Sequence, residues 1–161
     1  KIGAGEHKFT MAASKIKFEG FRSVYIQEED EKEQNIRKIL NFGHTIGHAI
    51  EKYKNFNMTH GECVALGCIA AAYISWKREM LSMEEYYEIR DMFVPFNLPI
   101  SIDDVDIEEV LNLTKSDKKM ENNQIKFVLL KKIGKAVIDR TVTDDEIRAA
   151  LKEIVYVEDF E

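Results

Sequence analysis

The chain has 161 residues, with 29 acidic and 23 basic side chains and a formal net charge of −6. A chain of this length buries roughly two-thirds of the surface that its unfolded form exposes, so one domain needs neither disulfides nor a structural metal. The acidic balance argues against a nucleic-acid partner, which would need a basic face, and no apolar run is long enough to cross a membrane. We therefore expect one globular, cytoplasmic domain that binds neither nucleic acid nor membrane.

The N-terminal third of the chain begins without a regular pattern and then becomes helical. Residues 1–23 show no clear period, because glycines interrupt them. From residue 28 to about residue 53 the apolar side chains follow a helical period, and residues 55–59 have the composition of a polar loop.

A second helix is predicted directly after this loop. Thr59 and Glu62 have the spacing of a capping box, which predicts a helix over residues 60–76. A further helix is expected over residues 83–93, and the prolines that follow it mark its end. Both cysteines fall in the first of these helices, five residues apart, a spacing that fits neither a redox motif nor a zinc knuckle. We expect both to be buried free thiols, as in a reducing compartment.

The C-terminal third has a mixed pattern. Residues 103–113 predict a short acidic helix, and residues 124–130 and 136–142 are β-rich runs separated by a hairpin turn. The capping-box spacing recurs at Thr143 and Glu146, which predicts a last helix to about residue 154.

Together these elements predict a mainly α fold: a multi-helix bundle with a small β-hairpin near the C-terminus. No repeat, low-complexity tract or linker divides the chain. We expect residues 24–161 to form one helical domain and residues 1–23 to be a distinct N-terminal segment.

One face of the first predicted helix carries side chains suited to chemistry. A solvated face is usually filled by Lys and Glu, whereas this face holds Arg, Asn and two His, which recognise anions, bind metals or move protons. At about 100° per residue, the side chains that fall within about 80° of one another are Glu33, Arg37, Asn41, His44 and His48.

His44 and His48 are four residues apart, which suits two metal ligands or one ligand beside a proton carrier. An incidental surface pair is the alternative. His60 follows after a short loop, so a reversal of the chain could bring it opposite His44. Because a helix N-terminus disfavours a positive charge, His60 would stay neutral there, as a metal ligand must.

Gly43 and Gly47 lie inside the same predicted helix, where each glycine costs about 0.5–1 kcal/mol relative to alanine. Two explanations are open. Either a substrate or another backbone approaches the histidine-bearing turns, or the two small residues allow tight packing of one helix on another.

Two motifs of the chain are highly specific, RKILNFGHTIGHAIE at residues 37–51 and HGECVA at residues 60–65. In both, the sequence resembles 3-dehydroquinate synthase. Further stretches that resemble the family, in the same order, are DEKE at 30–33, DKK at 117–119 and IKFVLL with a following IG in 125–134. The similarity covers roughly residues 24–152 and corresponds to the C-terminal, mostly helical half of that enzyme.

The resemblance implies a lyase of the shikimate pathway, which leads to chorismate and the aromatic amino acids. That enzyme converts 3-deoxy-arabino-heptulosonate 7-phosphate to 3-dehydroquinate and phosphate, with NAD for hydride transfer and zinc or cobalt as a Lewis acid. NAD would be bound mainly by the other half of the enzyme, since this chain has no Gly-rich βαβ fingerprint. The resemblance also implies a homodimer and a chain that is inactive without the NAD-binding half.

The resemblance assigns roles to individual residues. His44 and His60 would be metal ligands, His48 would lie beside the transferred proton or the phosphate, and Glu33 would be a general base. The family's third zinc ligand, an upstream glutamate, has no counterpart in the 43 residues before His44. The side chains that would hold the substrate's phosphate and carboxylate are Arg37, Asn41, His48, one lysine of the pair Lys118 and Lys119, and Lys17.

Lys17 is included because the family has a substrate lysine 21 residues before the first histidine, where this chain has Ser23. Two other functions are compatible with the pattern. One is the helical half of another sugar-phosphate cyclase or of a metal-dependent polyol dehydrogenase, and the other is a non-catalytic metal-binding or interaction module. Arg37 and the adjacent lysines Lys118 and Lys119 suit a phosphate and a carboxylate, which favours the synthase.

Overall fold

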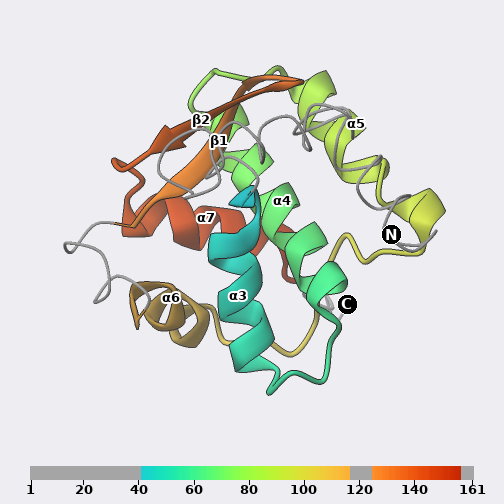
Figure 1. Cartoon of the computed structure of the whole chain (residues 1–161), viewed down its shortest axis with the longest axis vertical. Coiled ribbons are helices and arrows are strands. Elements are labelled where there is room, and N and C mark those ends of the chain that lie inside the picture. The colour runs from blue at the N-terminus through green and yellow to red at the C-terminus, as the bar shows by residue number, and fades with distance from the viewer. Residues whose placement is uncertain (1–40, 117–124, 157–161) are drawn as a thin grey trace, which may run out of the picture.

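In the computed structural model, residues 41–116 and 125–156 are described. Their elements are, in chain order, α3 (His44–Tyr53), α4 (His60–Lys77), α5 (Met83–Asp91), the 3-10 turn η2 (Val94–Phe96), α6 (Ile107–Ser116), β1 (Phe127–Lys132), β2 (Lys135–Asp139) and α7 (Asp144–Ile154). The predicted mainly α bundle with a small hairpin near the C-terminus is confirmed (Figure 1).

Helix α4 lies at the centre of the fold. Twelve of its 18 residues are buried, including the whole run from Cys63 to Ala72. A helix that is apolar on all sides is stable only when it is surrounded. Helices α3, α5 and α7 and strand β1 pack around it, and Figure 1 shows α3 running beside it.

Helix α3 is shorter than the sequence pattern predicted. The expected continuous helix to residue 53 is wrong at residues 41–43, because Gly43 has φ 81°, in the left-handed region, and α3 begins only at His44. An α-helix requires φ near −63°, so its hydrogen-bonding pattern cannot pass through this residue. Asn41 is exposed and does not share a helical face with His44 and His48. Residues 28–40 of the predicted helix lie outside the described residues.

Helices α3 and α4 approach each other closely at glycines. A Cβ atom on Gly67 would collide with the carbonyl oxygen of Gly43, and a Cβ atom on Gly47 would lie 3.0 Å from the carbonyl oxygen of Cys63. Of the two explanations for Gly43 and Gly47, the structure supports tight packing of helix against helix.

Reciprocal capping boxes begin three of the helices. Thr59 and Glu62 at α4, and Thr143 and Glu146 at α7, form the boxes that their spacing predicted. A third box, at the start of α5, was not predicted; its Ser82 accepts a hydrogen bond from the Glu85 amide. In each box a side chain satisfies a backbone amide that the first helical turn leaves unpaired.

Helix α6 begins at Ile107 rather than at residue 103 as predicted. Asp104 has φ 53°, which prevents an earlier start. Ile102 instead forms a parallel bridge to Val155: its amide donates to the Ile154 carbonyl at 2.8 Å, and its carbonyl accepts from the Tyr156 amide at 2.8 Å. This bridge ties the segment before α6 to the end of α7.

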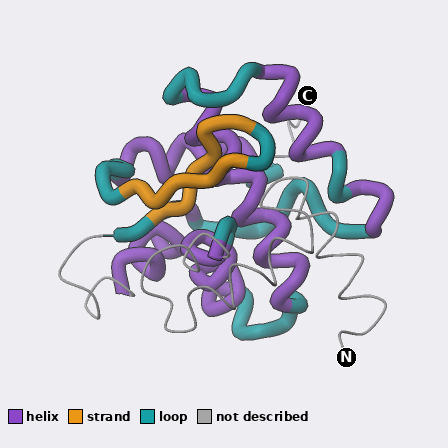
Figure 2. The backbone as a smooth tube through the Cα atoms, turned by 45° about the horizontal axis from the view of Figure 1, so that its top comes forward, coloured by secondary structure: helices purple, strands orange, loops and turns teal. Residues whose placement is uncertain are grey.

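The hairpin packs on the helices through β1. The strands are antiparallel, with Phe127 opposite Asp139 and Leu130 opposite Ala136, and Figure 2 shows them as a two-stranded ribbon among the helices. The first four residues of β1 are buried. Ser75 in α4 joins the strand to the helix, since its Oγ accepts a hydrogen bond from the Leu130 amide at 3.0 Å.

Arg78, directly after α4, connects three elements. Its guanidinium donates to the Glu146 carboxylate in α7 at 2.6 and 2.9 Å and to Asp139 in β2 at 3.0 Å. These paired contacts are of the stronger, charge-assisted kind. They fix the end of the central helix against both the hairpin and the last helix.

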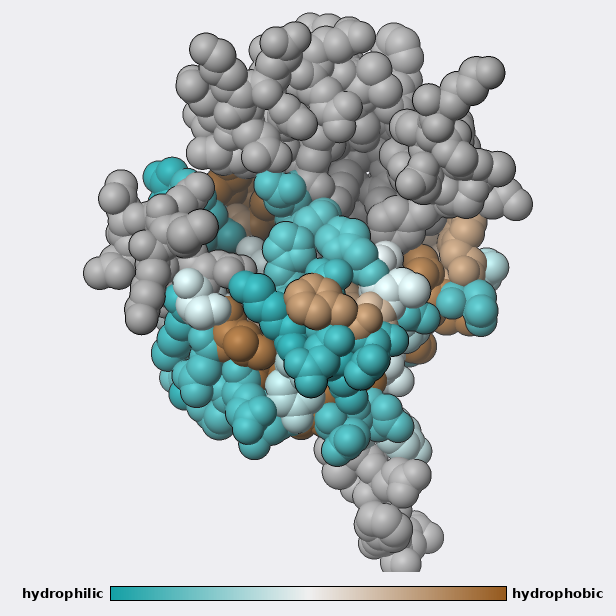
Figure 3. Space-filling view, turned by 60° about the horizontal axis from the view of Figure 1, so that its bottom comes forward, coloured by the Kyte–Doolittle hydropathy of each residue, from teal (hydrophilic) through white to brown (hydrophobic). Residues whose placement is uncertain are grey.

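One face of the fold is mostly polar. Figure 3 shows one face on which hydrophilic residues dominate and hydrophobic ones form small, separate areas. No helix within residues 41–116 and 125–156 has the length and apolar character needed to cross a bilayer. Cys63 and Cys68 are both buried thiols, as expected, and the described residues contain no disulfide between them.

Candidate metal centre

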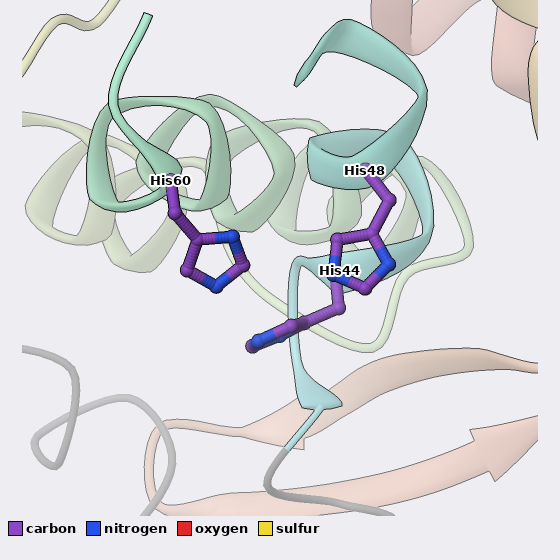
Figure 4. Close-up of side chains that lie close together, drawn as sticks. All are labelled: His44, His48 and His60. Carbon is purple, nitrogen blue, oxygen red and sulfur yellow. The ribbon is translucent and has the colours of Figure 1, made fainter. Parts of the chain in front are cut away.

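Three histidine side chains meet where α3 and α4 begin. The ring centroids of His44 and His48 are 5.3 Å apart, those of His44 and His60 are 5.3 Å apart, and those of His48 and His60 are 5.6 Å apart. One potential ligand nitrogen from each ring lies within 4.8 Å of the others. Figure 4 shows the three rings extending from α3 and α4 into the same space. We call this group the three-histidine cluster.

Local backbone structure brings the three residues together. His44 and His48 are one turn apart on α3 and so lie on the same face. The chain then reverses after α3, where Asn55 and Phe56 have φ 50° and 60°. The capping box at Thr59 fixes the start of α4, which makes His60 the first residue of that helix.

Hydrogen bonds hold two of the rings in defined orientations. The Nδ1 atom of His44 lies 3.3 Å from the carbonyl oxygen of Phe42, and the Nδ1 atom of His60 lies 3.2 Å from Oε2 of Glu51. A carbonyl or carboxylate oxygen accepts hydrogen bonds, so these contacts suit the neutral tautomer in which Nδ1 carries the proton and Nε2 has the lone pair. The Nε2 atoms are therefore the ligand atoms that these two histidines can offer.

The cluster is accessible from solvent on one side. His44 and His48 are partly buried, whereas 53% of the His60 side chain is exposed. Glu51, behind His60, is only 17% exposed. A ligand could thus reach the histidines while the carboxylate that orients His60 stays largely covered.

Cys63, three residues after His60, is not one of the residues whose ligand atoms lie within 4.8 Å of one another. Burial, with smaller contributions from the carboxylates of Glu51 and Glu62, raises the pKa of Cys63 to about 11. At neutral pH this side chain is a neutral core residue.

The donor set suits a transition-metal ion. Imidazole nitrogens are ordinary zinc and cobalt ligands, so two or three of these side chains can bind one such ion. At zinc–nitrogen distances of about 2.0–2.1 Å, two ligand atoms on one ion lie roughly 3.4 Å apart, so nitrogens that lie within 4.8 Å of one another would have to move closer together to bind it. The three-histidine cluster is the one group of three or more His, Cys, Asp or Glu with this geometry in the described part of the chain.

Only some of the predicted site residues lie in the described part of the chain. It brings His44, His48 and His60 together, and it places Asn41 on the surface two residues before Gly43. The other predicted site residues, which lie outside the described residues, are Lys17, Glu33, Arg37, Lys118 and Lys119.

Glu51 was missed as a site residue. Its position carried a signal, because it follows His44 by seven residues and His48 by three and so lies on the same face of α3. Its contact with His60 depends on the reversal between α3 and α4, which the helical pattern alone does not define.

Comparison with known proteins agrees with the resemblance found in the sequence. The profile of the family described as 3-dehydroquinate synthase C-terminal matches residues 20–120. The chain is 43% identical over 123 residues to 3-dehydroquinate synthase of Ruminiclostridium cellulolyticum, covering 76% of this chain and 34% of the relative. It is 38% identical over 122 residues to 3-dehydroquinate synthase of Acetivibrio thermocellus, covering 76% of this chain and 34% of the relative. The chain thus spans about a third of the length of the curated relatives it matches.

The fold has a counterpart among solved structures. ValA, a 2-epi-5-epi-valiolone synthase from Streptomyces hygroscopicus with NAD+ and Zn2+ bound, superposes with a TM-score of 0.74 at 21% identity, over 84% of this chain and 38% of that one. At this identity the likeness concerns the fold alone. The family profile covers more than half of the sequence and includes all three histidines of the cluster. The chain therefore belongs to the 3-dehydroquinate synthase C-terminal family.

Proposed function

We propose that this chain is the metal- and substrate-binding part of a 3-dehydroquinate synthase. The reaction is conversion of 3-deoxy-arabino-heptulosonate 7-phosphate to 3-dehydroquinate and phosphate, a lyase step in the shikimate pathway. The observation that carries the proposal is the three-histidine cluster, built from the two motifs of the sequence that most resemble the family. We place NAD mainly in a part of the enzyme beyond these residues, since the chain spans a third of its relatives.

His44 and His60 are the metal ligands in this proposal. Their Nδ1 atoms lie within hydrogen-bond distance of the Phe42 carbonyl and the Glu51 carboxylate, so Nε2 is the atom that each would offer to the ion. Zinc or cobalt bound there supplies a Lewis acid for the substrate's hydroxyl and carbonyl oxygens.

His48 is the proton carrier or phosphate contact. Its ring centroid lies 5.3 Å from that of His44 and 5.6 Å from that of His60, so it can reach a substrate held at the same place. No metal-binding role is needed for this, because a neutral imidazole can accept a proton and its protonated form can donate to an anion.

The remaining assignments follow the resemblance. Glu33 is the general base, and the residues that bind the phosphate and carboxylate of the substrate are Arg37, Asn41, one of Lys118 and Lys119, and Lys17. Arginine suits this work because its planar fork of donors matches both anions. We also propose that the enzyme is a homodimer and acts in the cytoplasm.

Metal titration tests the ligand assignment on this chain. Cobalt is added to the 161-residue protein and binding is followed by visible absorption. H44A and H60A are expected to weaken binding at least tenfold, whereas H7A, which removes the fourth histidine of the chain, is expected to leave it unchanged. Equal affinity of all these variants would contradict the metal site.

Turnover tests the reaction. In the native gene product that contains these residues, phosphate release from the heptulosonate phosphate in the presence of NAD is expected to fall sharply in H44A, H60A and H48A. Of these three variants, only H48A should still bind the metal. If the protein instead cyclises another sugar phosphate with higher kcat/KM, it is a different cyclase of this fold, and unchanged turnover in H44A and H60A would favour a non-catalytic module.

A further inference from the structure

The side chain of Glu51 is unusual among the acidic residues of the described chain because it contacts a member of the three-histidine cluster. Its Oε2 atom lies 3.2 Å from Nδ1 of His60, on the side of the ring away from Nε2. The carboxylate is 17% exposed and the imidazole 53% exposed. A partly buried carboxylate thus supports an exposed ring from behind.

His60 needs such support more than the other two histidines do. It is the first residue of α4, follows a loop with two left-handed residues, and has more of its side chain in solvent than an interior ligand would. An exposed imidazole loses rotamer freedom when it binds a ligand, and that loss weakens binding. A hydrogen bond that already fixes the ring removes part of this cost.

The fold gives Glu51 a rigid base. It is in the last turn of α3, on the same face as His44 and His48, and its backbone carbonyl accepts a hydrogen bond from the Phe56 amide at 3.0 Å. The residue therefore links the C-terminal turn of α3, the reversal after it and the first residue of α4.

We propose that Glu51 is a positioning residue of the metal centre. Its carboxylate accepts a hydrogen bond from the Nδ1–H group of His60, which fixes the tautomer and orientation of the ring and presents Nε2 to the ion. Carboxylate partners of metal-bound histidines also raise the basicity of the ligand nitrogen. The inference rests on the proposed function in that it takes His60 to be a metal ligand.

The test compares cobalt affinities of the 161-residue chain and its variants. E51A is expected to weaken cobalt binding about 10- to 100-fold, the usual effect of losing such a partner, and to shift the visible absorption bands of the bound ion. E51Q is expected to recover most of this loss, because the glutamine side-chain oxygen can still accept a hydrogen bond from Nδ1–H. Thermal unfolding of the metal-free E51A and E51Q proteins establishes that both fold.

Glu62→Gln is the matched control. Glu62 is two residues from His60 and carries the same charge, but its carboxylate accepts from the backbone amide of Thr59 at 2.8 Å. Glutamine also serves at this position of a capping box. E62Q should therefore keep wild-type cobalt affinity, which separates the hydrogen bond to His60 from the loss of a nearby negative charge.

Three results would overturn the proposal in distinguishable ways. If E51A binds cobalt as tightly as wild type while H60A does not, the positioning role is wrong and the metal centre stands. If E51Q binds cobalt as weakly as E51A, and both bind as weakly as H60A, Glu51 is itself a ligand rather than a hydrogen-bond partner of His60. If H44A and H60A bind as tightly as wild type, the metal centre is wrong and the role of Glu51 falls with it.

Discussion

The carbonyl oxygen of Gly43 occupies the place that a Cβ atom on Gly67 would need. The same Cβ atom would lie 2.8 Å from the backbone nitrogen of Gly47. Gly43 directly precedes His44, and Gly67 lies two turns after His60 in α4. The separation of α3 and α4, and with it the distance between His44 and His60, is therefore set by backbone packed against backbone.

Gly67→Ala should disturb both stability and metal binding. The new methyl group meets backbone atoms that cannot rotate away, so α3 must shift; overpacking of this kind costs about 1–3 kcal/mol. Because the shift separates His44 from His60, the cobalt affinity of the chain should fall as well. Urea unfolding and cobalt titration measure the two effects.

Gly61→Ala is the control for this substitution. It adds the same methyl group in the same helix, next to His60, where a Cβ atom meets nothing within 4 Å. Stability should be unchanged or rise by about 0.4–1 kcal/mol, since alanine restricts the unfolded chain. Wild-type stability and affinity in G67A would show that the helix crossing does not control the site.

Arg78→Met should destabilise the fold in a pH-dependent way. The hydrogen bond from Arg78 holds the pKa of the Glu146 carboxyl below its ordinary value of 4.5. A carboxyl with a lowered pKa contributes stability that is present above pH 4.5 and is lost as pH falls through its folded pKa. At pH 7 we expect the free energy of unfolding to fall by about 1.5–3 kcal/mol, because the variant loses charge-assisted hydrogen bonds between side chains that are more than two-thirds buried.

Unfolding of wild type and R78M, measured from pH 7 down to pH 3, tests this expectation. The difference between the two proteins should shrink below pH 4.5. Arg148→Met is the control, because Arg148 pairs with Glu108 and Asp145 on the surface and its removal should matter less. A pH-independent difference between R78M and wild type would contradict the coupling to Glu146.

The features that sequence predicted correctly are local ones. The capping boxes at Thr59 and Thr143 depend on two residues three positions apart, and both begin a helix where that spacing placed them. The meeting of His60 with His44 needed only one further assumption, that a short polar loop reverses the chain. The two capped helices, and the meeting of His44 with His60, could thus be predicted without knowledge of the tertiary structure.

The features that sequence did not predict depend on contacts distant in the chain. Gly43 adopts φ 81° against α4, where a Cβ atom would lie 2.5 Å from the Cys68 Sγ atom, so the break before α3 is decided by a residue 25 positions away. The helical period of the sequence continues through this point and gave a false continuous helix. Glu51 was missed for a similar reason, since its partner is on the next helix.

Cys63 should be an unreactive thiol at neutral pH. Its pKa is raised from 9.0 to about 11, chiefly by burial, so almost no thiolate is present at pH 8. In a C68A background, alkylation of the folded chain by iodoacetamide at pH 8 should be much slower than alkylation of the chain unfolded in guanidinium. Similar rates in the two states would contradict both the burial and the raised pKa.

The raised pKa of Cys63 also predicts how the stability of the fold changes at alkaline pH. A group whose pKa is raised on folding contributes stability that is complete below its unfolded pKa and is lost as pH rises through its folded pKa. For Cys63 this loss falls between pH 9 and pH 11. Stability measured across that range should decline less steeply in C63A than in wild type, and equal slopes would contradict the assignment.

Ser75→Ala should loosen the hairpin from the central helix. The Ser75 hydroxyl donates to the Ala71 carbonyl at 2.9 Å and accepts from the Leu130 amide at 3.0 Å, and it is fully buried. Alanine leaves that amide buried without its partner, at a cost of about 1–3 kcal/mol. Ser116→Ala, whose hydroxyl is exposed and donates only to Leu113, should cost less. Urea unfolding measures both, and hydrogen exchange of the Leu130 amide should accelerate in S75A alone; unchanged protection there would show that the serine does not anchor β1.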